Sequence, residues 1–151
     1  MELNTQLMLN AASYFGYQEK PGPGSDPLIL SIIRRVFPEW KDDSTVAWCS
    51  LFMIEIAQNV CAENTMHLKH PGLARGWLEV GEEIDLDKLR YGDVVILTRG
   101  APNNGNGHVG FFYNRIGDRI YLLGGNQNNR VCIADYAASR FLGGRRLRPE
   151  E

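Results

Sequence analysis

The stretch that decides the fold is the most regular helical pattern of the chain, Cys49-Ser50-Leu51-Phe52-Met53-Ile54-Glu55-Ile56-Ala57-Gln58-Asn59-Val60. Its apolar residues recur at the three- and four-residue spacing of one buried helix face, at Phe52, Met53, Ile56, Ala57 and Val60. Four residues able to cap its first turn precede it, namely Asp42, Asp43, Ser44 and Thr45. We therefore expect a helix that begins at Cys49 and buries one face in the core.

Away from this helix, the two halves of the chain differ in character. Helical spacing and capping signals predict further helices at about 3–15, 26–37 and 73–79, the second opened by Asp26 and Pro27. Short β-branched and aromatic runs predict strands at 93–98, 108–113, 119–123 and about 131–136. This order predicts an α+β domain in which amino-terminal helices pack on a carboxy-terminal antiparallel sheet.

Size and charge narrow the classes of function. The 151 residues are 44% hydrophobic, which suits a single domain over 1–151. The net charge of −2 gives no electrostatic footprint for nucleic acid, and no apolar run reaches the roughly 18 residues of a membrane span. We expect a monomer that binds neither nucleic acid nor membrane. The start of the chain has no basic or apolar signal segment, so we expect synthesis in the cytoplasm without a signal peptide.

The three cysteines do not form a disulfide framework. Cys49 and Cys61 lie about 18 Å apart along one helix, beyond disulfide reach. Cys49 falls in the first turn of its helix, where unpaired N–H groups and the helix dipole favour a thiolate. The dipole alone contributes about 0.3–1 kcal/mol, less than one pKa unit, so a catalytic Cys49 needs a histidine partner.

His108 is the candidate partner, because it opens a predicted strand after a loop rich in Asn and Gly. A base histidine needs a group that fixes its tautomer, and the amides of Asn126 and Gln127 follow the next strand. A two-residue turn at 117–118 places Gln127 opposite His108, whereas a three-residue turn at 116–118 places Asn126 there. A one-residue slip exchanges the faces of a strand, so spacing leaves both alternatives open.

Four short motifs carry a family resemblance. They are Trp-Cys-Ser-Leu-Phe at 48–52, Tyr-Gly-Asp-Val-Val at 91–95, Gly-His-Val-Gly-Phe at 107–111 and Gly-Gly-Asn-Gln at 124–127. Together they resemble papain-like cell-wall peptidases and amidases of the NlpC and CHAP type, particularly the small phage-endolysin-like branch. The segments 14–22 and 74–78 also resemble that branch, so the likeness covers about 10–148.

The resemblance implies roles for individual residues. Cys49 would be the nucleophile, His108 the general base and acid, and Asn126 the orienting residue, with Gln127 as second choice. Some CHAP enzymes carry a glutamate where this chain has Gly124, so orientation of His108 here rests on an amide. The backbone N–H of Cys49 would donate to the oxyanion.

The implied function is hydrolysis of a peptide or amide bond of bacterial peptidoglycan through an acyl-thioester, without a cofactor. We expect action in the periplasm or at the cell wall after release or secretion. Delivery machinery, or an immunity protein if the chain is an effector toxin, would be its partner. The alternatives are a catalytically silent module that binds wall peptides, and a papain-like hydrolase or deamidase acting on a protein substrate.

The remaining candidate residues carry weaker expectations. Trp48, Arg75 and Trp77 are candidates for a substrate cleft, although core packing also explains the two tryptophans. Cys61, His67 and His70 are too loosely spaced to predict a metal site, and we expect none. Asp93 follows a turn glycine and is expected to fix the start of its strand.

Overall fold

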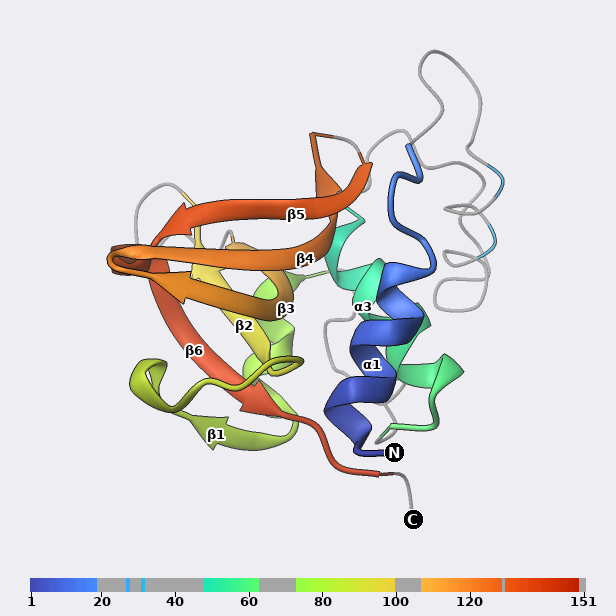
Figure 1. The fold of residues 1–151 in the computed structure, drawn as a ribbon, viewed down its shortest axis with the longest axis horizontal. Helices are drawn as coiled ribbons and strands as arrows, with labels where there is room; N and C mark the ends of the chain where they lie inside the picture. The colour runs from blue at the N-terminus through green and yellow to red at the C-terminus, as the bar shows by residue number, and fades with distance from the viewer. Residues whose placement is uncertain are drawn as a thin grey trace.

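The computed structural model describes residues 1–18, 27, 31, 48–62, 73–99, 107–128 and 130–149. These residues form an α+β fold around one antiparallel sheet (Figure 1). The helical elements are α1 (Leu3–Ala12), α3 (Cys49–Asn59) and the 3-10 helices η2 (Ala74–Glu79), η3 (Leu86–Lys88) and η4 (Ala138–Arg140). The strands are β1 (Glu82–Ile84), β2 (Val94–Thr98), β3 (Gly107–Ile116), β4 (Arg119–Gln127), β5 (Arg130–Ala137) and β6 (Phe141–Arg146). The predicted α+β class is therefore confirmed.

The six strands follow the order β1-β6-β2-β3-β4-β5, and every neighbouring pair is antiparallel. The strands β2 to β5 form the predicted meander, while β6 returns to lie between β1 and β2. Gly117 and Asp118 form the turn that joins β3 to β4. Next to this turn Ile116 pairs with Arg119, the register of a two-residue loop.

Strand β2 is buried on both faces, because successive side chains of a strand point to opposite sides of the sheet. Val94 and Ile96 join the main core with α1 and α3, whose side chains fill that cluster together with residues of β3 and β4. Val95 and Leu97 join a second cluster on the other face. Figure 1 shows α1 and α3 side by side next to the sheet.

The predicted helices have mixed outcomes. The helix from Cys49 is confirmed, but its N-cap residue is Trp48, which makes no side-chain cap hydrogen bond. Helix α1 ends at Ala12 rather than at about 15, since the chain turns from Ser13 and reaches a left-handed Gly16. The segment 73–79 forms a 3-10 helix. The helix predicted at 26–37 and the cap residues 42–45 fall almost entirely outside the described residues.

The predicted strands are all present, with β3 and β4 longer than expected. The sequence pattern missed β1 and β6. Strand β6 reads Phe-Leu-Gly-Gly-Arg-Arg, which has few β-formers, and it is held by pairing with a strand on each side. None of the helices in the described ranges is long and apolar enough to span a bilayer.

Asp93 ties the ends of the chain to the start of β2. Its buried carboxylate accepts two hydrogen bonds from the Arg146 guanidinium, at 2.9 and 2.8 Å. It also accepts one from the Asn4 amide at 2.9 Å and one from the Arg90 backbone at 2.8 Å. The expectation that Asp93 fixes the start of this strand agrees with these contacts.

Candidate functional site

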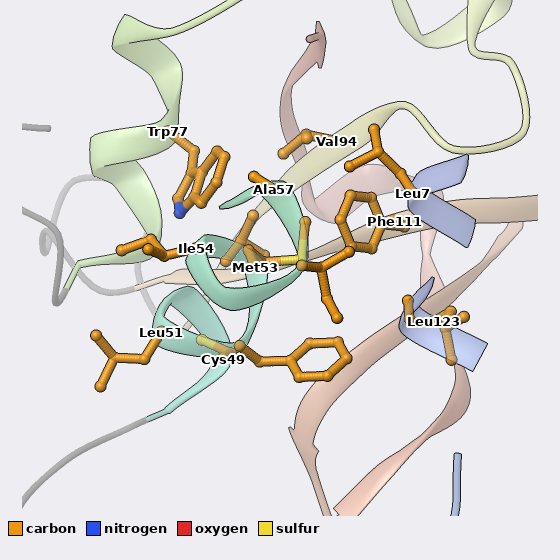
Figure 2. Packing of buried hydrophobic residues seen from close by; sticks show 14 of the residues in the cluster. Leu7, Cys49, Leu51, Met53, Ile54, Ala57, Trp77, Val94, Phe111 and Leu123 are labelled. Carbon is orange, nitrogen blue, oxygen red and sulfur yellow. The ribbon is translucent and has the colours of Figure 1, made fainter. Parts of the chain in front are cut away.

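The amino-terminal turn of α3 lies against β3 and β4 at one end of their ladder. The pairs of the two strands run from Ile116 with Arg119 to Phe111 with Leu123. Beyond this point Gly125 lies so close to the helix that a Cβ there would be 2.6 Å from the Trp48 ring. Figure 2 shows Cys49 at the start of the helix, at the edge of the buried cluster that holds Phe111 and Leu123.

Cys49 is a buried thiol, with 3% of its surface exposed. Burial raises the pKa of Cys49, because the charged thiolate loses its hydration. A backbone hydrogen bond from Val109, the nearby charge of Arg99 and the backbone of Ser50 act in the opposite direction but do not outweigh burial. The sulfur therefore lies against the backbone of β3 directly after His108, and its resting form is the thiol.

His108 is completely buried on the face of the sheet opposite to Val109. Its Nε2 lies 3.0 Å from Oε1 of Gln127 and 3.1 Å from the hydroxyl of Tyr136. Burial lowers the pKa of His108 from 6.5 to about 4, and the charges of Arg99 and Arg140 lower it further, while Gln127 opposes them. His108 is therefore a neutral imidazole at neutral pH.

Gln127, and not Asn126, contacts His108, and two irregularities, one in β3 and one in β4, explain why. The register shifts once between Phe112 and Asn114, and an unbroken continuation would place Asn126 opposite His108. A second shift falls between Gly124 and Gln127, where Asn126 adopts a left-handed φ of 58°. Asn126 takes up the extra residue, and the side chain of Gln127 faces the imidazole.

The Gln127 amide has a defined orientation. Its nitrogen donates to the backbone oxygen of Cys132 at 2.6 Å and to that of Leu122 at 3.3 Å, so Oε1 faces His108. Gly124 provides the room, because a Cβ there would lie 3.1 Å from Oε1. An amide oxygen only accepts hydrogen bonds, so Nε2 of His108 carries the proton, and the lone pair of the ring lies on Nδ1, which faces Arg99.

Two arginines provide the positive charge around the imidazole. A nitrogen of Arg99 lies 3.5 Å from Nδ1 of His108, a long distance for a hydrogen bond. Arg140 donates from Nε to the backbone oxygen of Thr98 at 2.9 Å and lies over the ring of Tyr136. Arg99 acts on the pKa of Cys49, His108 and Tyr136 alike, which places the three groups in one electrostatic environment.

Of the three residues predicted for a substrate cleft, Trp48 and Trp77 are buried and Arg75 is half-buried. Trp77 is completely buried in the core and donates to the Ser50 hydroxyl at 2.8 Å. Trp48 is 2% exposed and covers Gly125. Arg75 is half-buried, and its side chain lies against Gly107, the residue before His108.

The described residues hold no group of three or more metal-ligating side chains. His67 and His70 lie outside the described residues, and Cys61 is an exposed free thiol.

Sequence reasoning missed Tyr136 and Arg99. No short motif marks either residue, and only the assembled sheet brings the long Tyr136 side chain from β5 to β3.

Comparisons with known proteins identify the fold. No protein-family model matches the chain, and no curated protein matches its sequence. Among solved structures, the chain is similar to a lipoprotein-like protein of the NLP/P60 family from Staphylococcus aureus subsp. aureus Mu50, with a TM-score of 0.54 and 18% identity. The match covers 96% of this chain but 41% of that protein, so the chain spans about two fifths of its length. The likeness shows a common fold with an NLP/P60 protein and gives no support to the CHAP or endolysin-like branch.

Proposed function

We propose that the chain is a cysteine hydrolase that cleaves a peptide or amide bond of bacterial peptidoglycan. The observation that carries the proposal is the buried His108, whose Nε2–H is held by Gln127, so that its basic nitrogen is Nδ1, with only a long contact of 3.5 Å from Arg99. The Cys49 sulfur contacts the backbone of Val109, the next residue of the same strand. The common fold with an NLP/P60 protein supports a wall peptide as the substrate.

The proposed reaction starts from a neutral thiol and a neutral imidazole. The S–H bond of Cys49 breaks, its proton passes to Nδ1 of His108, and the sulfur electron pair forms a bond to the substrate carbonyl carbon. The first helical hydrogen bond of α3 runs from the Phe52 N–H to the Trp48 oxygen, so the N–H of Cys49 belongs to the first turn and would donate to the oxyanion. The imidazolium then protonates the leaving amine, and water hydrolyses the thioester. Because burial opposes both charged forms, we expect proton transfer and attack to be coupled.

A catalytically silent module that binds wall peptides is the second candidate. The burial of Cys49 and His108 favours it, because neither group is accessible to a large substrate in this conformation. The raised pKa of Cys49 and the lowered pKa of His108 also oppose a preformed ion pair. A hydrolase that cleaves a protein would use the same residues and the same reaction, and it would differ only in the substrate that it binds.

Mass spectrometry of fragments released from purified sacculi separates these candidates. We expect wild type to create new amine and carboxyl ends, and Cys49→Ala and His108→Ala to create none. Cys61→Ala is the matched control, since this exposed thiol follows the same helix and should leave the release unchanged. Release that persists in Cys49→Ala contradicts the nucleophile. A folded wild type that releases nothing favours the silent module, or a protein substrate if proteins from the host are cleaved instead.

We further propose that the chain acts in the periplasm or at the cell wall, with delivery machinery or an immunity protein as partner. Expression in a bacterial host tests the location. Export of the chain through an added signal sequence should lyse the cells, whereas the same chain kept in the cytoplasm should not. Exported Cys49→Ala is the control, and lysis by this variant would contradict a hydrolytic cause.

A further inference from the structure

Tyr136, on β5, places its hydroxyl where His108 meets Gln127. The hydroxyl donates to Oε1 of Gln127 at 3.0 Å and lies 3.1 Å from Nε2 of His108. The same Nε2 lies 3.0 Å from Oε1, so three polar atoms form a closed triangle. The two rings also pack against each other, with centroids 5.2 Å apart and planes inclined by 37°.

One assignment of hydrogens satisfies the whole triangle. The Gln127 amide nitrogen is committed to two backbone oxygens, so Oε1 accepts from both other members. The single hydroxyl hydrogen of Tyr136 goes to Oε1. The phenol oxygen is then left to accept, and the Nε2–H of His108 has two acceptors. In the opposite tautomer Nε2 would carry no proton, and its lone pair would face the lone pairs of the Gln127 amide oxygen.

The ring of Tyr136 is itself held in place. The guanidinium carbon of Arg140 lies 5.1 Å from the ring centroid, and this arginine is fixed by its bond to the Thr98 oxygen. Burial raises the pKa of Tyr136 to about 12, so the phenol keeps its proton across the physiological range. Tyr136 therefore stays neutral beside the imidazole and does not act as a base.

We propose that Tyr136 is a positioning residue that, together with Gln127, holds the imidazole of His108 as the Nε2–H tautomer, so that Nδ1 is the nitrogen that takes the Cys49 proton, an inference that rests on the proposed function. When Nδ1 takes the thiol proton, the Nε2–H becomes a stronger donor, and two acceptors keep the imidazolium from turning away. Tyr136 acts through His108 and touches no reacting atom.

The variant Tyr136→Phe tests this role, because it keeps the ring and removes only the hydroxyl. We expect kcat for the release of sacculus fragments to fall about tenfold with little change in KM, the usual effect of one hydrogen bond to a group that becomes charged. In NMR spectra, we expect wild-type His108 as a single Nε2–H tautomer with a slowly exchanging Nε2–H. In the variant this proton should exchange faster. Tyr113→Phe, an exposed tyrosine on β3, is the matched control.

The NMR readout judges the proposal without an activity. An unchanged Nε2–H exchange rate in Tyr136→Phe overturns the positioning role, since a ring that only packs would behave in this way. An Nδ1–H tautomer in wild type overturns it as well, whether or not the variant folds. If wild type releases nothing from sacculi but the exchange rate changes as expected, the positioning geometry stands and the proposed function fails.

Discussion

Acid is expected to destabilise the folded chain through His108, whatever the substrate. Burial lowers the pKa of this completely buried imidazole from 6.5 to about 4, so the unfolded chain binds its proton first as the pH falls. Stability is then fully present above pH 6.5, declines as the pH falls toward 4, and declines no further through this group below 4. At about 1.4 kcal/mol per pKa unit, this gap corresponds to roughly 3 kcal/mol, a large share of the 5–15 kcal/mol that is typical of a domain.

Urea unfolding at pH values from 4 to 7.5 measures this effect, with tryptophan fluorescence as the signal because Trp48 and Trp77 are buried. We expect wild type to lose about 3 kcal/mol more than His108→Gln over this range, because the glutamine does not titrate. The chain has three histidines. The double variant His67→Gln/His70→Gln is therefore the control, and it should keep the wild-type pH dependence.

Parallel curves for wild type and His108→Gln would refute the reasoning. They would mean that His108 binds protons equally well in the folded and unfolded chain, and hence that water reaches the imidazole in the folded state. A pH dependence that disappears in the double variant instead would assign the effect to the other two histidines.

Three further predictions test the surroundings of the site. Gly125→Ala should lower the free energy of unfolding by about 1–3 kcal/mol, measured in urea, because its Cβ would lie 2.6 Å from Trp48. Asp93→Ala should cost about 3–5 kcal/mol in the same assay, since it removes the carboxylate from a buried ion pair, and a loss below 1 kcal/mol would contradict this. Gln127→Ala should lower kcat about 10- to 100-fold, whereas Asn126→Gly, which suits the left-handed φ of 58°, should stay near wild type; the reverse order would restore Asn126 as the orienting residue.

Much of the fold could be predicted from local patterns. The spacing of apolar residues located α3 and its first residue, because one helix face had to be buried against a sheet. The β-branched runs located the meander for the same reason. Strand β6 could not be predicted this way, since its glycines and arginines are held by two neighbouring strands and not by their own preference.

The candidate site was predictable in part only. Cys49 was predicted from its place at the start of a helix, and His108 from its place at the start of a strand. The choice between two adjacent amides depended on one irregularity in β3 and one in β4, and nothing in the spacing of the sequence reveals a bulge. Tyr136 lies on β5, two strands away from the strand β3 that carries His108, so their contact could not be predicted before the strand order was known.

The position of β6 has a consequence for how the domain is made. This strand is the last of the sheet to be synthesised, yet it lies between β1 and β2 and brings the Arg146 partner of Asp93. While the ribosome is still adding these residues, β1 has no neighbour and the carboxylate of Asp93 has no arginine. The nascent chain therefore cannot complete the sheet until β6 emerges, and the domain is expected to fold only after this strand has left the ribosome.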